Sequence, residues 1–446
     1  MNYLILASSP YSHILPLKAL ADQLNKRPDT SLYCMSIEKN KNMIENFGMK
    51  FIAYPQGITP VSTNRVDMDK VVKRTNELWN KGEIEAGYEY FIDKDIESLY
   101  DITANQIQDL EKIIQELNID ILIRDAIDKF GHYLAKKLQL PLLGYITHNL
   151  YSKQFFESEP EYFYPIFLNA LIGNRNKNIS PSFYRSYWKK CSEIHEKHGR
   201  EIGPFPLAPF HQFDPLTELT IIFSTDFLQP RRSLYAERNY LMVYPDIQIR
   251  EIEKIPNDLK EFIEINEKII YISSGSITTQ SIKYYKNFIS SLTSKGDYSL
   301  VVSVGKLFYK ILKKYIEDES LIEKVYISEW IPQRYVLSHS SLFITSGGQN
   351  SILESIYYEV PMLITPMTSE QRINGIIAER IGVAYTTYNF RTDTISTAKM
   401  INTLLTKQEI KKNLKTFSDE YKSHINNFKK LDQYLDNIEY YGKRKF

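Results

Sequence analysis

The sequence of 446 residues is poor in cysteine, with only Cys34 and Cys191. They lie far apart and no C-x-x-C pair occurs, so the sequence supports neither a zinc site nor a disulfide framework. Charge of one sign is not in excess either, because Lys plus Arg number 55 and Asp plus Glu number 54. Proteins bind the phosphate backbone of nucleic acids through clusters of Lys and Arg in excess over acidic residues, so we expect no nucleic-acid partner. We expect two reduced thiols and no bound cofactor.

Long apolar runs are also absent. No window approaches the roughly 18 apolar residues that a membrane helix needs. The first residues, Met1–Ala7, lack the basic region and the apolar stretch of a signal peptide. We therefore expect a cytoplasmic protein without a transmembrane segment, and we allow for a weak homodimer.

Aromatic residues, by contrast, are abundant, with 33 Tyr and 22 Phe. A cluster of them lies between Tyr151 and Trp188, where the rhythm of strands and helices breaks. Two interpretations of this cluster stay open. It is either helical core and helix-packing surface, or the wall of an acceptor pocket, since apolar clefts suit flat or hydrophobic ligands.

Short apolar segments alternate with helical patterns along the rest of the chain. In the first half, strands are predicted at Tyr3–Ala7, Ser31–Met35, Lys50–Ala53, Ile119–Ile123 and Pro141–Ile146. In the second half, strands are predicted at Ile269–Ile272, Leu300–Val304, Val325–Ile327, Leu342–Thr345 and Met362–Thr365. This alternation predicts parallel sheets that are covered by helices on both faces.

Length and pattern together predict an α/β protein of two doubly wound, Rossmann-like domains that face one another across a cleft. We place the first domain at residues 1–245, a charged linker at 246–257 and the second domain at 258–424. Residues 425–446 are expected to form a C-terminal helix that returns to the first domain. In such sheets ligands bind beyond the carboxyl ends of the strands, so site residues are expected there.

The most informative segment begins at Trp330. Within it, Phe343–Thr345 is predicted to end a strand, Gly347-Gly348 to form a tight turn, and Asn350–Glu354 to start a helix. A helix N-terminus after a glycine turn binds anions, because backbone N–H groups and the helix dipole converge there.

Polar and aromatic side chains accompany this turn. Asn350 and Ser351 offer side-chain donors to a diphosphate, and Glu354 can either reach back to cap the helix or accept from a ribose hydroxyl. Trp330 offers a flat face on which a nucleobase can stack, worth about 1–3 kcal/mol. Glu370-Gln371, just past a strand, can hydrogen-bond sugar hydroxyls.

At these spacings the segment resembles the donor-binding signature of UDP-glycosyltransferases with the GT-B fold, in the short-spaced form of bacterial macrolide-type enzymes. The resemblance covers nearly the whole chain and fades at residues 55–110 and 150–215. It implies that the first domain binds the acceptor and the second domain binds the UDP-sugar donor.

The resemblance also implies individual donor contacts. Trp330 stacks on uracil, the backbone of Ile331 reads the base edge, and Gln333 contacts the ribose together with Glu354. The remaining contacts are to the diphosphate, by Ser276, Asn350 and Ser351, and to the sugar, which in this family is often glucose, by Glu370 and Gln371.

One position departs from the family's pattern. The family places His directly before the two glycines, where it bonds a donor phosphate, and here Ser346 precedes Gly347 and Gly348. A Ser hydroxyl still donates one hydrogen bond, but it is shorter and carries no charge. The departure implies weaker donor affinity, an altered donor or, in the extreme, a catalytically inactive relative.

A second motif, Ala7–Pro16, follows the first predicted strand. It resembles the family's strand–loop segment that ends in Gly-His, with His13 in place and Ser12 in the position of the Gly. A neutral His is a suitable general base near pH 7, and works best when a carboxylate orients its other nitrogen. Asp125, at a predicted strand end, matches the family's partner Asp, and Asp128 is the competing candidate.

These inferences predict an enzyme that transfers a hexose from a UDP-sugar to a hydroxyl of a small aromatic or apolar acceptor, such as a natural product, with inversion at the anomeric carbon. His13 would deprotonate the acceptor and Asp125 would stabilise the imidazolium. UDP would leave stabilised by a helix N-terminus rather than by a metal, since the second domain has no Asp-x-Asp motif.

Three alternatives are weighed against this interpretation. An accessory protein that binds a nucleotide sugar or a glycosylated ligand without turnover is supported only by Ser346. A nucleotide-sugar epimerase of the same fold usually lacks the Trp-x-Pro-Gln segment that begins at Trp330. Glycosylation of a lipid at a membrane surface predicts a basic or apolar patch at residues 55–110, where Lys70, Lys73 and Arg74 are the candidates.

Overall fold

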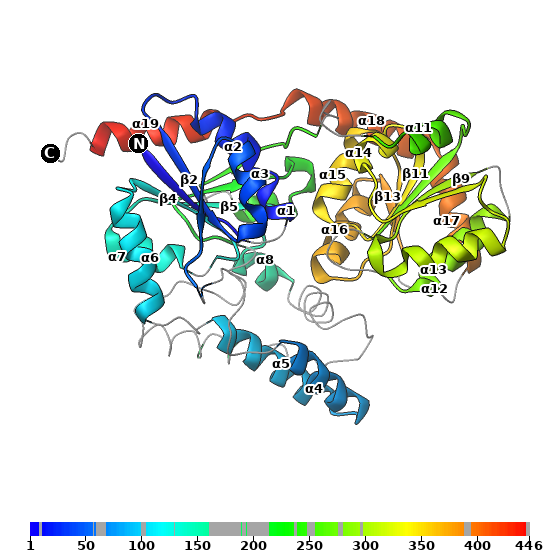
Figure 1. The fold of residues 1–446 in the computed structure, drawn as a ribbon, viewed down its shortest axis with the longest axis horizontal. Coiled ribbons are helices and arrows are strands. Elements are labelled where there is room, and N and C mark those ends of the chain that lie inside the picture. The colour runs from blue at the N-terminus through cyan, green and yellow to red at the C-terminus, as the bar shows by residue number, and fades with distance from the viewer. Residues whose placement is uncertain are drawn as a thin grey trace. The chain divides into compact units, whose positions relative to one another are not determined.

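The computed structural model describes residues 1–8, 11–56, 58, 68–99, 104–128, 130–159, 189, 193, 214–235, 239–247, 255–274, 280–294, 298–387 and 394–442. They divide into two compact units. The first contains the described residues up to Pro245 together with those from Asn426 onward, and the second contains those between Asp246 and Ile425. Each unit has its own parallel sheet (Figure 1).

The first unit contains a sheet of seven parallel strands in the order β3-β2-β1-β4-β5-β6-β7. Its strands are β1 (Asn2–Leu6), β2 (Ser31–Ser36), β3 (Lys50–Ala53), β4 (Ile121–Asp125), β5 (Leu142–Ile146), β6 (Leu219–Ile222) and β7 (Tyr240–Met242). The central strands β4 and β5 are buried throughout. Their near-continuous apolar sequences reflect burial on both faces, as in other parallel sheets.

Helices cover both faces of this sheet. The helices of the first unit are α1 (Tyr11–Ile14), α2 (Leu17–Leu24), α3 (Lys41–Asn46), α4 (Met68–Asn80), α5 (Ile84–Leu99), α6 (Ala104–Glu116), α7 (Gly131–Leu138), α8 (Lys153–Ser158) and α19 (Lys429–Gly442). Successive strand residues point to opposite faces, so Ile5 of β1 packs with Leu20 of α2 in one core, and Leu4 packs with Leu110 of α6 in the other.

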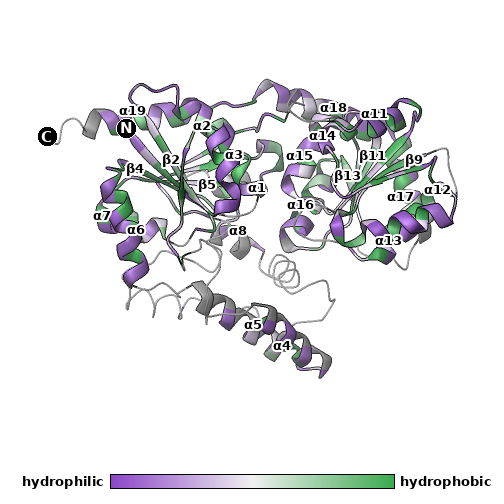
Figure 2. Cartoon of the chain, viewed as in Figure 1, coloured by the Kyte–Doolittle hydropathy of each residue, from purple (hydrophilic) through white to green (hydrophobic). Residues whose placement is uncertain are grey.

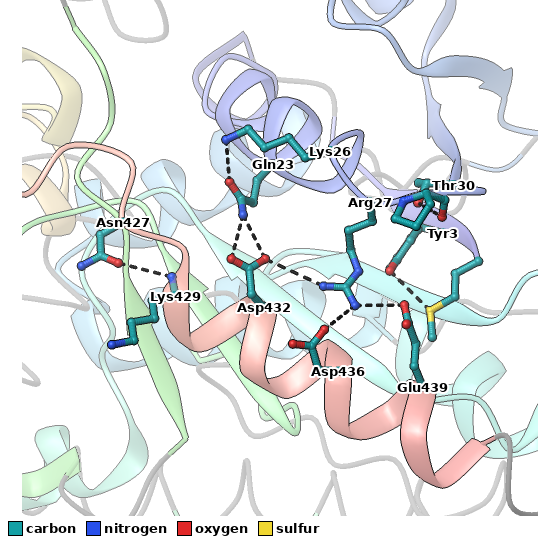
Figure 3. Close-up of polar contacts among 12 residues, drawn as sticks. Tyr3, Gln23, Lys26, Arg27, Thr30, Asn427, Lys429, Asp432, Asp436 and Glu439 are labelled. Carbon is teal, nitrogen blue, oxygen red and sulfur yellow. Dashed lines mark hydrogen bonds and ion pairs between the residues drawn. The ribbon is translucent and has the colours of Figure 1, made fainter.

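The last helix of the chain, α19, completes the core of the first unit. Leu431 and Leu435 are fully buried in the same cluster as α2. Polar contacts flank them, because Gln23 donates to Asp432 at 2.8 Å and Arg27 donates to Asp436 at 2.6 Å (Figure 3). Helix α19 is therefore integral to the unit that also contains β1.

The second unit contains six parallel strands in the order β10-β9-β8-β11-β12-β13. Its strands are β8 (Ile269–Ser273), β9 (Ser299–Ser303), β10 (Val325–Ser328), β11 (Ser340–Thr345), β12 (Met362–Ile364) and β13 (Ala384–Thr386). Its helices are α11 (Asn257–Glu264), α12 (Ile282–Thr293), α13 (Gly305–Asp318), α14 (Gln333–Leu337), α15 (Gln349–Tyr357), α16 (Ser369–Arg380), α17 (Thr394–Thr406) and α18 (Gln408–Ser423). Hydrophobic colour concentrates in the strands, while the surrounding helices show hydrophilic turns (Figure 2).

Both strand orders are those of doubly wound sheets, so the predicted fold class is confirmed. In each sheet the strand order reverses direction between the strands that come first and fourth along the chain. These are β1 and β4 in the first sheet, and β8 and β11 in the second. Ligands of doubly wound sheets bind beyond the carboxyl ends of the strands at such switch points. Side chains at the ends of these four strands are therefore the first place to look for chemistry.

Candidate functional site

His13 and Asp125 meet at the switch point of the first sheet. His13 lies in the short helix α1 that follows β1, and Asp125 is the last residue of β4, which pairs with β1 in parallel. Nδ1 of His13 lies 2.9 Å from Oδ2 and 3.2 Å from Oδ1 of Asp125. The structure thus brings together the two residues that the sequence singled out as base and partner.

The Asp125 carboxylate is buried among hydrogen-bond donors. It accepts from the Ser8 hydroxyl, from the Tyr145 hydroxyl at 3.0 Å and from the backbone N–H of Ile127 at 3.1 Å. Burial raises the pKa of Asp125, but the charge and hydrogen bond of His13, followed by the bonds from Ser8 and Ile127, hold the pKa below its usual value. Asp125 is therefore a carboxylate anion at neutral pH.

Asp128, the competing partner, belongs to a different buried pair. Its Oδ2 lies 3.6 Å from Nε of Arg124 and accepts from the backbone N–H of Gly131 at 2.7 Å. Burial raises the pKa of Asp128 to about 6 in spite of Arg124. Arg124 also donates to the backbone carbonyls of Ala126, at 2.8 Å, and of Asp128, so this pair holds the loop that follows β4.

The two glycines after β11 differ in what the fold demands of them. Gly347 has φ +83°, and a Cβ built there would lie 2.6 Å from Cγ2 of Ile364. Gly348 has φ −62°, and a Cβ there would meet nothing within 4 Å. The turn itself requires Gly347, whereas the space beside Gly348 stays open.

Ser346 lies beside this turn and is buried, with 2% of its surface exposed. Its hydroxyl has no hydrogen-bond partner within the described part of the chain, and an unpaired buried hydroxyl costs about 1–3 kcal/mol. The nine-residue helix α15 begins directly afterwards, without a side-chain cap at Gly348. An unpaired hydroxyl therefore lies three residues before the first residue of an uncapped helix, and helix N-termini of this kind bind anions.

Three predicted donor-site residues form one hydrogen-bonded cluster. Nε2 of Gln333 donates to Oε2 of Glu354 at 2.6 Å and to the Ser351 hydroxyl at 3.3 Å. Nε of Arg334 donates to the other oxygen of Glu354 at 3.0 Å. Of the two roles that the sequence left open for Glu354, the structure does not show the cap, because α15 has no side-chain cap and this carboxylate accepts from Gln333 and Arg334 of α14. Arg334 was not predicted, although its place directly after Gln333 in the motif was a usable signal.

Trp330 is the most exposed aromatic residue of this segment, with 64% of its surface accessible. It lies between β10 and α14, next to the buried Ile331. Burial of Trp is strongly favourable, so this exposed indole, three residues before Gln333 in the chain, is available as a stacking surface. Asn350 lies in the first turn of α15 and is partly exposed.

The start of α16 places Glu370 and Gln371 next to the glycine turn. Oε1 of Glu370 accepts from Asn374 at 2.7 Å, and Asn374 also donates to the carbonyl of Gly347 at 3.1 Å. Gln371 forms a capping box with Thr368, a structural role that the sequence analysis did not assign. Ser276, the remaining predicted donor residue, lies outside the described residues.

Three further expectations can be compared with the described part of the chain. It contains no group of three or more His, Cys, Asp or Glu side chains that would hold a metal ion, and none of its helices is long and apolar enough to cross a membrane. Of the aromatic cluster, Tyr151 and Phe155 are fully buried with ring centroids 5.3 Å apart. Most of the cluster lies outside the described residues, so both interpretations of it stay open.

The basic patch expected for a membrane-surface enzyme gains no support from α4. Lys73 is exposed there, and the exposed Arg74 pairs with Glu77 on the same helix at 3.1 Å. A solvated helix face with internal ion pairs is the simpler description of these residues.

Comparison with known proteins places the chain in a family. A family model described as UDP-glucoronosyl and UDP-glucosyl transferase matches residues 2–445. The chain is 26% identical over 270 residues to the uncharacterized UDP-glucosyltransferase YojK of Bacillus subtilis (strain 168), an alignment that spans 60% of each chain. It is 25% identical to UDP-glucuronosyltransferase 2B16 of Oryctolagus cuniculus, over 98% of this chain and 84% of the relative.

Solved structures show the same fold. UDP-glucose: anthocyanidin 3-O-glucosyltransferase in complex with UDP superposes with a TM-score of 0.68 at 16% identity, over 98% of both chains. The glycotransferase of kitacinnamycin superposes with a TM-score of 0.66 at 16% identity, over 95% of both chains. The predicted GT-B fold and the predicted enzyme class are thereby confirmed. Because this family model matches nearly the whole length of the chain, the chain belongs to the UDP-glucuronosyl and UDP-glucosyl transferase family.

Proposed function

We propose that this enzyme transfers a hexose, glucose or a close relative, from its UDP-sugar to a hydroxyl of a small aromatic or apolar acceptor, with inversion and without a metal ion. The observation that carries the proposal is the hydrogen-bonded pair of His13 and Asp125 at the switch point of the first sheet. We further propose that the enzyme works in the cytoplasm.

His13 is the general base of the proposed reaction. Because Nδ1–H donates to Asp125, Nε2 is the basic nitrogen of the ring. Nε2 takes the proton of the acceptor hydroxyl while the acceptor oxygen bonds to the anomeric carbon. The bond between that carbon and the β-phosphate oxygen breaks, and UDP leaves with the electron pair. The buried anion of Asp125 stabilises the imidazolium that forms.

The donor is held by residues of the second unit. Trp330 stacks on the base, while Gln333 and Glu354 bind the ribose hydroxyls. The diphosphate is bound by the first N–H groups of α15 and by the Ser346 hydroxyl, which also stabilise the leaving UDP. This part of the proposal is supported by the unpaired buried hydroxyl of Ser346 and by the uncapped start of α15. The proposal also includes contacts to the diphosphate by Ser276, Asn350 and Ser351, and contacts to the sugar by Glu370 and Gln371.

With Ser346 before the two glycines, the proposed phosphate-binding site has an uncharged side chain at this position. A hydroxyl supplies one hydrogen bond, where a His in its place would supply a longer side chain that can carry charge. The proposal therefore expects a lower affinity for UDP than a charged grip would give, with turnover retained because the base lies elsewhere in the chain.

The acceptor class rests on the relatives. Two proteins of similar fold are named UDP-glucose: anthocyanidin 3-O-glucosyltransferase and the glycotransferase of kitacinnamycin. We propose an acceptor of similar small-molecule character for this chain, because its aromatic content is high at residues 151–188.

The experiment that tests the proposal compares His13→Ala with the wild type in a mass-spectrometric transfer assay with UDP-sugars and phenolic acceptors. Removal of the base is expected to lower turnover by about 10²–10⁴-fold. The matched control is His339→Ala, because His339 is exposed and its ring bonds locally to the carbonyl of Tyr335 at 2.9 Å. Turnover by His13→Ala near the wild-type rate would contradict the base assignment, and UDP binding without any wild-type turnover would favour an accessory role.

A further inference from the structure

The Tyr145 hydroxyl shares an oxygen atom of Asp125 with His13. Tyr145 lies in β5 directly opposite Asp125 in the register of β4 and β5, and it is fully buried. Its hydroxyl donates to Oδ2 of Asp125 at 3.0 Å, and Nδ1 of His13 reaches the same Oδ2 at 2.9 Å. The hydroxyl of Ser8 donates to this oxygen as well. Three side-chain donors from three different segments therefore converge on one carboxylate oxygen.

Competition for that oxygen has a chemical consequence. Each hydrogen bond to a carboxylate disperses its negative charge and makes it a weaker acceptor for the others. A carboxylate that is already well hydrogen-bonded stabilises a neighbouring imidazolium less than a carboxylate that serves His13 alone. The imidazole then loses its proton at a lower pH, and the fraction of neutral base at pH 7 rises.

We propose that Tyr145 is a positioning residue of the reaction, whose hydroxyl fixes Oδ2 of Asp125 and limits how strongly that carboxylate holds the protonated ring of His13. This inference rests on the proposed function, because it assigns a role relative to the proposed base. It does not depend on the identity of the sugar or of the acceptor. Tyr145 acts through Asp125, since the two are joined by the hydrogen bond at 3.0 Å.

Other groups near the pair do not provide the same control. Burial raises the pKa of Tyr145, Tyr54 and Cys34 far above neutrality, and Asp125 adds to that effect for both tyrosines, so all three stay protonated. Burial lowers the pKa of His132 to about 3, so its ring is uncharged at pH 7. Charged side chains near the pair in the described part of the chain include Arg124 and Asp128, which form a pair with each other, and Asp214, whose charge acts on Arg124.

Asp128 titrates within the pH range of this experiment, because burial raises its pKa to about 6. Its charge acts on the wild type and on a Tyr145 variant alike. A difference in His13 titration between the two proteins therefore reports the Tyr145 hydroxyl and not Asp128.

The test is a pH titration of the His13 ring in Tyr145→Phe, in which proton NMR monitors the imidazole signals. Eight histidines are present, and the His13 signal is identified by its loss in His13→Gln. Removal of the hydroxyl is expected to raise the pKa of His13 by about 0.5–1 unit, because the carboxylate of Asp125 loses one hydrogen bond and then holds the protonated ring more strongly. The acid limb of kcat/KM is expected to move upward by the same amount.

Two further variants make the outcome decisive. Tyr3→Phe is the matched control, because Tyr3 is also fully buried in this sheet but its hydroxyl lies against the sulfur of Met1 at 3.4 Å. It should leave the His13 titration unchanged. Ser8→Ala removes another donor from Oδ2 and should shift the titration upward like Tyr145→Phe, which keeps the test available if Tyr145→Phe fails to fold.

An unchanged or lowered pKa of His13 in folded Tyr145→Phe would overturn the inference. Loss of turnover without any movement of the acid limb would also overturn it, because that is what a purely structural tyrosine produces. Failure of the proposed function gives a different result, namely full turnover in His13→Ala. The NMR titration is independent of turnover, so the two failures are distinguishable.

Discussion

The two adjacent glycines that follow β11, Gly347 and Gly348, differ in what the fold demands of them. A residue with a Cβ at position 347 would have to adopt φ +83° and to displace Ile364. Ala at that position is expected to lower the free energy of unfolding by about 2 kcal/mol or more, from left-handed strain and overlap. Ala at position 348 meets no protein atom and should leave stability unchanged.

The same pair separates stability from donor binding. Gly348 stands at the N-terminus of α15, where the proposed phosphate approaches the backbone. We expect Gly348→Ala to weaken UDP about tenfold, by a steric effect worth about 1.4 kcal/mol, in isothermal titration calorimetry. Urea unfolding of both variants supplies the comparison. UDP bound by Gly348→Ala as tightly as by the wild type would place the phosphate elsewhere.

Residue positions at strand ends could be predicted, but most of their contacts could not. The pairing of His13 with Asp125 was implied by the family resemblance and supported by their places at the ends of predicted strands, with Asp128 as the competing partner. The contact of Tyr145 with Asp125 depends on the register between β4 and β5, and the contact of Arg334 with Glu354 depends on how α14 packs on α15. Neither register nor helix packing leaves a periodic signal in a single sequence.

At the scale of elements, α19 offers the clearest test of packing. Leu435 is fully buried against the core that contains α2, and Gln433 on the same helix is exposed. Leu435→Ala is expected to lower the free energy of unfolding by about 2–5 kcal/mol, through lost burial and a cavity, as measured by urea denaturation.

Gln433→Ala is the control for this change, and surface substitutions of its kind alter stability by about 0.5 kcal/mol or less. A Leu435→Ala protein as stable as Gln433→Ala would mean that α19 contributes nothing to the core of the first unit.

The long central strands were the most predictable. The strands β1, β4, β8 and β11 have five or six residues that are mostly buried, which produces continuous apolar runs. Three shorter strands were missed, namely β6 with four residues and β7 and β13 with three residues each. β12 also has three residues and was predicted, so length alone does not decide which strands the sequence pattern shows.

At the scale of the whole molecule, each unit contains one half of the proposed reaction. The first unit contains the hydrogen-bonded pair of His13 and Asp125, and the second contains Ser346 and the N-terminus of α15, the proposed phosphate-binding site. The family and the fold follow from the whole chain, whereas the roles of the base and of the phosphate-binding site are proposals that rest on these two groups of residues.

The measurement that tests this account most directly is proton NMR of the anomeric signals during turnover of UDP-α-glucose with a phenolic acceptor. The account predicts that the α-linked donor is consumed while a β-linked product forms, and that His13→Ala slows this conversion by about 10²–10⁴-fold. An α-linked product, or conversion by His13→Ala at the wild-type rate, would contradict direct displacement assisted by His13.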